Sequence, residues 1–179
     1  MRKLTVAALC LGIAACSGEA PEKKAEEVPD NFPAGTWQVG SEVTAMRSTD
    51  KTTPAVKAAV GDKENATVCV DKASQQPSPE LFSGSGYQCT YKSSYMKGGT
   101  LNAQLDCHRE GLQGSIMMSV SGSYTARDFT GTVDSTSYLS QAGRYQMSRK
   151  IHGTVTPGAC TPAPADGDDE AEDGNASGG

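Results

Sequence analysis

Residues 87–107 form two runs in which apolar and polar residues alternate on either side of a glycine pair, and they read Tyr87-Gln88-Cys89-Thr90-Tyr91-Lys92-Ser93-Ser94-Tyr95-Met96-Lys97-Gly98-Gly99-Thr100-Leu101-Asn102-Ala103-Gln104-Leu105-Asp106-Cys107. In the first run, most odd positions hold tyrosine or cysteine. In the second run, odd positions hold Leu101, Ala103, Leu105 and Cys107. A period of two is typical of half-buried strands, so these residues predict a β-hairpin.

The length of the hairpin loop sets which side chains face each other. A two-residue Gly98-Gly99 loop would place odd positions opposite even ones and mix apolar with polar side chains. A three-residue loop from Lys97 to Gly99 keeps odd positions opposite odd ones and puts Gly99 where φ is positive. We therefore predict the longer loop, with Cys89 opposite Cys107.

Further strands follow and precede this hairpin. Residues 116–124 and 129–133 alternate in the same way, and a loop from Thr125 to Asp128 would pair Tyr124 with Phe129. Residues 145–155 predict a last strand, and residues 35–43 and 66–71 predict two early ones. The sequence thus predicts an all-β domain, a single antiparallel meander of about seven strands. Its apolar face must be hidden by curling or by closing into a barrel.

Two segments between these strands have other patterns. Pro54 to Val60, with Thr53 as a cap and Gly61 after it, predicts two helical turns. Residues 72–86 contain Pro77, Pro79, Gly84 and Gly86 and predict a mobile loop.

The N-terminus reads as a targeting segment. Arg2 and Lys3 precede an apolar run that ends at Ala15, too short to span a bilayer. Residues 13–16, Ile-Ala-Ala-Cys, resemble a bacterial lipobox, which implies lipidation of Cys16 and a membrane anchor. Ser17, by resemblance to proteobacterial sorting rules, favours the outer membrane. The alternative is an ordinary signal peptide that is cleaved near Ala15.

Charge divides the rest of the chain into parts. Residues 16–34 carry five acids and two Lys among several prolines, typical of an extended tether. Residues 35–160 form the predicted domain, with twelve Lys and Arg against ten acids. Residues 161–179 carry six acids and no base, which predicts a disordered acidic tail. No basic patch is present to bind nucleic acid, and the acidic flanks would repel phosphates.

Six cysteines are encoded, of which Cys10 leaves with the signal peptide and Cys16 would carry lipid. The four that remain, in an exported chain, predict two disulfides among Cys69, Cys89, Cys107 and Cys160. Their wide spacing disfavours a zinc site or Cys-x-x-Cys redox chemistry. The hairpin register favours Cys89 with Cys107 and Cys69 with Cys160, and a Cys69 to Cys89 bridge remains a competitor.

We find no pattern that predicts catalysis, and we expect neither an enzyme nor a bound cofactor or metal. The two histidines, His108 and His152, fall on predicted polar faces, and no nucleophile motif lies near them. Tyrosines of the 87–95 strand could form a binding surface, although packing in the core is the more common role of such residues.

The order of these features resembles the domain-of-unknown-function 3617 family of small exported proteobacterial proteins. The resemblance lies in the lipobox, Gly35-x-Trp37, Val68-Cys69, Cys89, Cys107 and the Gly158 to Cys160 ending, over residues 35–160. It implies an envelope protein without an assigned activity. We therefore expect a lipid-anchored accessory or interaction protein of the cell envelope. The alternative is a small β-barrel inhibitor or ligand-binding module, because Tyr87-Gln88-Cys89 weakly resembles an element of lysozyme-inhibitor lipoproteins.

Overall fold

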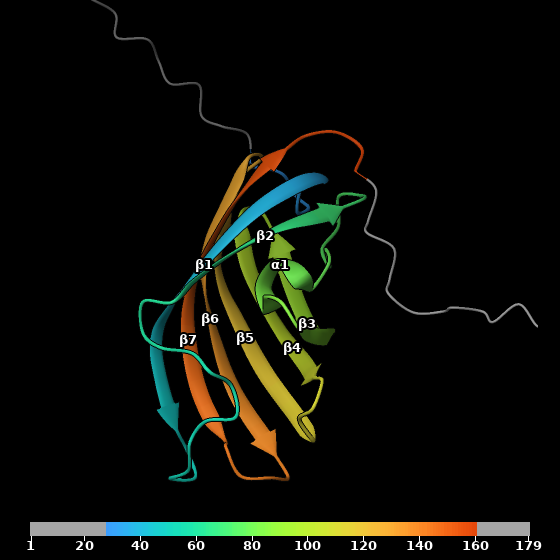
Figure 1. Cartoon of the computed structure of the whole chain (residues 1–179). Helices are drawn as coiled ribbons and strands as arrows, with labels where there is room; N and C mark the ends of the chain where they lie inside the picture. The colour runs from blue at the N-terminus through green and yellow to red at the C-terminus, as the bar shows by residue number, and fades with distance from the viewer. Residues whose placement is uncertain (1–27, 161–179) are drawn as a thin grey trace, which may run out of the picture.

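The computed structural model describes residues 28–160, which form one antiparallel sheet of seven strands and one short helix (Figure 1). The elements are β1 Gly35–Ser48, β2 Lys63–Val70, α1 Glu80–Ser83, β3 Tyr87–Lys97, β4 Thr100–Arg109, β5 Gly114–Tyr124, β6 Asp128–Leu139 and β7 Tyr145–Thr156. The strand order is β2-β1-β7-β6-β5-β4-β3. The prediction of an all-β meander with seven strands is confirmed.

The sheet curls into a half-barrel. Strands β2 and β3 lie at its two edges, and the sheet remains open between them. Short helix α1 lies on the concave side, where Figure 1 shows it framed by the curved strands. Of the two predicted ways to hide the apolar face, the molecule uses curling, and the segments on the concave side complete the cover.

An aromatic cluster fills the space between the concave face and its cover. Phe32 precedes β1 and Phe82 belongs to α1, and neither is exposed by more than 1%. The Phe32 ring centroid lies 4.7 Å from that of Trp37 on β1, and the Phe82 centroid lies 5.9 Å from that of Phe129 on β6. Contacts of this kind add to the free energy gained by burial. Two side chains from outside the sheet therefore plug the half-barrel.

The folded unit begins before Gly35, the predicted boundary of the domain. Phe32 donates its backbone N–H to Ser74 O at 3.0 Å, and Ser74 N–H returns a bond to Phe32 O at 3.1 Å. This bridge holds the segment before β1 against the segment that leads to α1. Phe32, which the charge pattern assigned to the tether, is thus part of the core.

Both predictions about the connecting segments differ from the structure. Residues 54–60 form no helix, because the chain there is held by tertiary bonds such as Ala55 N–H to Gly143 O at 2.9 Å. Long-range bonds of this kind override a weak local helix preference. Residues 72–86, predicted as a mobile loop, contain α1 and bury Leu81 and Phe82.

The hairpin loop between β3 and β4 is one residue shorter than predicted. Lys97 pairs with Thr100, and φ is +56° at Gly98 and +78° at Gly99, as in two-residue hairpin turns. A β-bulge between Tyr91 and Ser93 compensates by inserting one residue, so Cys89 still faces Cys107. The predicted three-residue loop is wrong, and the predicted cysteine register is confirmed.

The bulge also reverses the faces of the last part of β3. Met96, rather than Tyr95, points into the core: Met96 is fully buried, and Tyr95 is 56% exposed. The predicted apolar row of Tyr87, Cys89, Tyr91 and Tyr95 therefore ends at Tyr91. In contrast, the β5–β6 register with Tyr124 opposite Phe129 and Val120 opposite Val133 is confirmed.

Two disulfides join the four predicted cysteines. Cys69 is bonded to Cys160, which ties β2 to the segment after β7, and Cys89 is bonded to Cys107 across β3 and β4. This is the connectivity that the hairpin register favoured, and the competing Cys69 to Cys89 bridge is absent. The first bridge encloses 91 residues along the chain, and closing so long a loop contributes about 4 kcal/mol in the chain-entropy account.

The plug predicts a large cost for truncating Phe82. We expect Phe82→Ala to lower the free energy of unfolding by about 3–5 kcal/mol, because it removes a fully buried ring whose neighbours cannot all collapse. Glu80→Ala, an exposed change on the same helix, should alter it by less than about 0.5 kcal/mol. Urea unfolding with both disulfides intact measures the two values. Equal small effects from both variants would contradict the plug.

Candidate functional site

A cavity of about 230 Å³ lies where the loop before β2 meets the edge of β3 and the concave face of β1 and β7. Its apolar wall consists of Val43, Val56, Ala58 and Met147. Its polar wall includes Glu64, Ser85, Tyr87, Arg109 and Arg149, together with Ser41, Lys57, Asp62 and Lys63. The alternation of β7 directs Met147 and Arg149 to the same concave face, which explains how a charged group reaches an otherwise apolar surface.

Arg149 is the most unusual side chain of this site, because it is a cation that is only 4% exposed. Its Nη2 donates to Phe82 O at 2.9 Å and to Ser83 O at 2.8 Å, so it fastens α1 to the sheet. Its Nε is buried and has no hydrogen-bond partner among residues 28–160. Burial lowers the pKa of the guanidinium, which nevertheless stays charged because arginine does not lose its proton in proteins.

Gly84 makes the close approach of Arg149 to the α1 segment possible. Its φ is +77°, and a Cβ at this position would lie 2.6 Å from Arg149 Nη1. Any other residue would be strained in its backbone and would clash with the guanidinium. The glycine after α1 therefore leaves the space that the buried guanidinium of Arg149 occupies.

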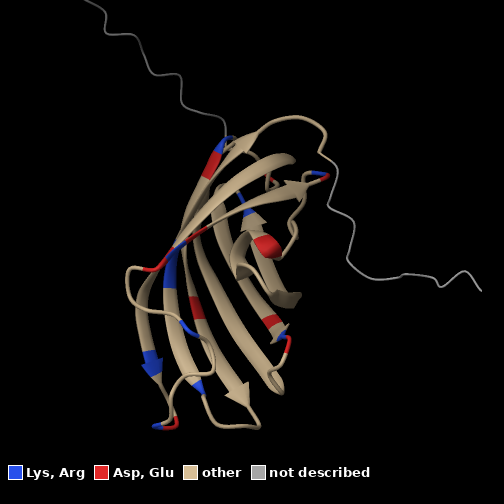
Figure 2. Cartoon of the chain, viewed as in Figure 1, with Lys and Arg blue, Asp and Glu red and all other residues tan. Residues whose placement is uncertain are grey.

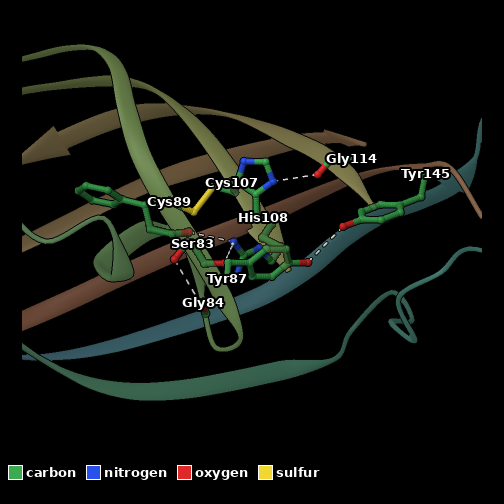
Figure 3. Close-up of a disulfide and its surroundings, with 10 residues drawn as sticks. Ser83, Gly84, Tyr87, Cys89, Cys107, His108, Gly114 and Tyr145 are labelled. Carbon is green, nitrogen blue, oxygen red and sulfur yellow. Dashed lines mark hydrogen bonds between the residues drawn. A yellow bond between two sulfur atoms is a disulfide. The ribbon is translucent and has the colours of Figure 1, made fainter. Parts of the chain in front are cut away.

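Two tyrosines meet beside the arginine. The hydroxyl oxygens of Tyr87 on β3 and Tyr145 on β7 are 3.2 Å apart, and Figure 3 shows the two side chains pointing toward each other. Burial, together with the neighbouring Tyr87, raises the pKa of the Tyr145 hydroxyl, so it stays protonated at neutral pH. The guanidinium carbon of Arg109 lies 4.8 Å from the centroid of the Tyr87 ring, a cation–π contact.

Glu64 on β2 supplies a carboxylate near both guanidiniums. It accepts a hydrogen bond from Ser85 N–H at 3.0 Å. Burial raises the pKa of this carboxyl, but hydrogen bonds from Ser85 and the charges of Arg149 and Arg109 outweigh it, and the resulting pKa is below its ordinary value. Glu64 is therefore ionised at neutral pH and holds the Ser85 turn to β2.

The predicted site residues are cysteines, and the structure describes four of them, in the bridges Cys69–Cys160 and Cys89–Cys107. The disulfide between Cys89 and Cys107 lies near the tyrosine pair and joins β3 to β4 there (Figure 3). His108 and His152 are exposed, and His108 Nδ1 lies 2.9 Å from Gly114 O. Cys16, the predicted lipidation residue, lies outside the described residues. Within residues 28–160 no group of three or more His, Cys, Asp or Glu residues is arranged to hold a metal ion.

The tyrosines of β3 take three different roles. Tyr87 lines the cavity, and Tyr91 donates its hydroxyl to Pro77 O at 2.9 Å. Tyr95 is exposed to solvent. The predicted binding surface of tyrosines therefore reduces to Tyr87, which is joined there by residues from other strands.

Sequence reasoning missed Arg149 and Arg109 as members of the site. A signal for Arg149 was present, because it occupies the core parity of β7 between Met147 and Ile151. A signal for Arg109 was also present, because the predicted register that sets Cys89 opposite Cys107 also sets Tyr87 opposite Arg109, and the structure has this pair. Figure 2 shows the charged residues as isolated segments of both signs along strands and loops. No helix within residues 28–160 is long and apolar enough to cross a membrane.

The fold and the site together define a small antiparallel half-barrel, braced by disulfides, with a polar cavity under its open edge. Residues 32–165 match the profile of the family described as protein of unknown function (DUF3617). Because the match spans most of the chain, this protein belongs to that family. No curated protein and no solved structure matches it.

The ionised Glu64 predicts a specific pH dependence. Since its folded pKa lies below the ordinary value of 4.5, its contribution to stability is complete above that value and is lost as the pH falls through the folded pKa. We expect Glu64→Gln to be less stable than the unaltered protein at about pH 6 and to lose less stability on acidification. Chemical unfolding across this range measures the difference. Glu80→Gln, an exposed change of the same kind, is the control, and parallel pH profiles for all three proteins would contradict the assignment.

Proposed function

We propose that this protein is a lipid-anchored protein of the bacterial cell envelope that acts by binding, in an accessory or interaction role, and not by catalysis. The support for the location is the lipobox-like ending Ala15-Cys16 together with two disulfides, which form and persist in oxidising compartments. Ser17 after the cysteine supports attachment to the outer membrane. The membrane is then the first partner of the chain, through acyl groups on Cys16.

The observation that carries the binding role is the cavity. Concave sites with an apolar wall and a few fixed polar groups are the usual binding sites of small molecules. Here Tyr87, Arg149 and Glu64, which line the cavity, are each held in place by hydrogen bonds to other parts of the fold, so the polar groups are preorganised. Of the two predicted roles, the ligand-binding module has this specific support. The lysozyme-inhibitor form of that role rests on Tyr87-Gln88-Cys89 and stays a prediction that a lysozyme assay tests.

Photo-crosslinking in intact cells tests the binding role directly. A photoreactive benzoylphenylalanine in place of Ala58, which lines the cavity, should yield an adduct, because a bound ligand would lie within its reach. The same group in place of Tyr138, which is 60% exposed, is the control and should not yield that adduct. Mass spectrometry of the purified protein identifies the adduct. Identical adduct patterns at both positions would contradict a ligand in the cavity.

The anchor has its own test. We expect Cys16→Ser to abolish labelling by an alkyne fatty acid and to remove the protein from the membrane fraction, because the thiol that carries the acyl group is gone. Cys10→Ser, a change within the segment that is removed, should leave labelling intact. If the Cys16→Ser protein were still labelled and still pelleted with membranes, the lipid anchor would be wrong.

A further inference from the structure

We infer that the cavity takes a small organic anion, a carboxylate or phosphate monoester on a short apolar stem, with its charged group facing Arg109 and Arg149. This inference rests on the proposed function, since it names the class of ligand that the cavity binds. It follows from the charges of the cavity, the unused donors of its two arginines, and its size.

Positive charge is in excess in the cavity. Four cations line it, Lys57, Lys63, Arg109 and Arg149, against the two carboxylates of Asp62 and Glu64, and Lys63 is also paired with Glu42 at 3.6 Å, which leaves one cation in excess. Both carboxylates already accept hydrogen bonds from the protein: Asp62 from Ala59 N–H at 2.7 Å and Glu64 from Ser85 N–H at 3.0 Å. An anion would therefore meet cations whose charge is only partly balanced.

The two guanidiniums retain donors for a ligand. Arg149 uses Nη2 for the carbonyls of α1, and its Nη1 makes no hydrogen bond within residues 28–160, whereas its Nε is enclosed by protein atoms and is not exposed to the cavity. The guanidinium carbon of Arg109 lies 4.8 Å from the centroid of the Tyr87 ring, a cation–π contact that does not depend on a conventional hydrogen bond from its N–H groups. Within residues 28–160, Arg109 donates no side-chain hydrogen bond. Planar arginine donors of this kind match carboxylate and phosphate oxygens.

The two arginines share neighbours in the cavity wall. A Cβ at Gly84 would lie 2.6 Å from Arg149 Nη1 and 3.1 Å from Glu64 Oε2, and Arg109 lies over Tyr87, whose hydroxyl meets that of Tyr145 on the strand of Arg149. The wall also has an apolar part, in which Val56 and Met147 are buried. A volume of about 230 Å³ is below the range of roughly 300–1,000 Å³ that is usual for drug-sized ligands. The site therefore fits a charged group with a short apolar stem.

Methionine methyl NMR of the full exported chain, carried on nanodiscs of phosphatidylcholine, tests this inference. Met147 lines the cavity, and Met117 lies on the opposite face of the sheet as an internal reference. We expect hexyl phosphate and hexanoate to shift the Met147 signal in a saturable way and to leave that of Met117 unchanged. Hexanol has the same stem without the charge, and its affinity should be lower by about tenfold or by a larger factor.

Two variants assign the anion contact. Arg109→Gln should weaken hexyl phosphate binding by about tenfold, because it removes a charged donor. Lys150→Gln removes one positive charge from the exposed face of β7 next to Arg149 and should leave binding unchanged. Unaltered signals of the core residue Met118 confirm that each variant is folded. Equal binding by both variants would overturn the inference.

The outcomes separate this inference from the proposed function. If hexanol shifts Met147 as strongly as hexyl phosphate does, the cavity binds ligands and the anionic class is wrong. If none of the three probes shifts Met147, the inference fails, and the binding role is then decided by the cross-linking at position 58: an adduct there shows a ligand of another class, and its absence shows that the binding role fails as well. Nanodiscs that contain phosphatidylglycerol distinguish the source of the ligand: a shift of Met147 without added probe identifies a membrane lipid headgroup, and a shift with soluble probes alone identifies a free organic anion.

Discussion

A single curved sheet exposes its concave apolar face unless something covers it, and the fold of this protein depends on how that cover is held. Phe32 and Phe82 come from segments outside the sheet and pack onto Trp37 and Phe129. The cover is fastened by polar bonds, since Arg149 binds the carbonyls of Phe82 and Ser83. Burying a cation is costly unless it is paired or hydrogen-bonded. The position of α1 is therefore coupled to the one arginine on the inner face of β7.

The same arrangement creates the cavity. Helix α1 ends at Ser83 with Gly84 as its C-cap, and beyond it the concave face is lined by Tyr145, Met147 and the segment around Val56. There the inner face changes from aromatic to polar, with buried Ser135 and Ser137 on β6 and the hydroxyl pair of Tyr87 and Tyr145. The apolar end of the half-barrel stabilises the fold, and the polar end leaves donors available for a ligand. One buried side chain, Arg149, belongs to both.

Local patterns predicted the strands well because alternation is a property of consecutive residues. They predicted the register of Cys89 and Cys107 for a reason that was partly wrong: a two-residue loop and a bulge at Lys92 together give the same offset as the predicted longer loop. Glycine tolerates either loop, so composition alone could not distinguish them. The predicted helix at residues 54–60 failed because bonds to Gly143 come from the other end of the chain. The role of Phe82 was missed because proline and glycine surround it.

Alternation, cysteine number and family motifs are local or compositional features, so the all-β class, the seven strands and the two disulfides could be read from the chain before its structure was known. The curvature of the sheet, the plug and the cavity depend on contacts between residues far apart in sequence. Arg149 and Phe82 O are separated by 67 positions, and Tyr87 and Tyr145 by 58. No local period encodes such pairs, because they follow from how strongly the sheet curls and from which loop reaches its concave face. The strands are thus a property of the sequence pattern, and the candidate site is a property of the tertiary fold.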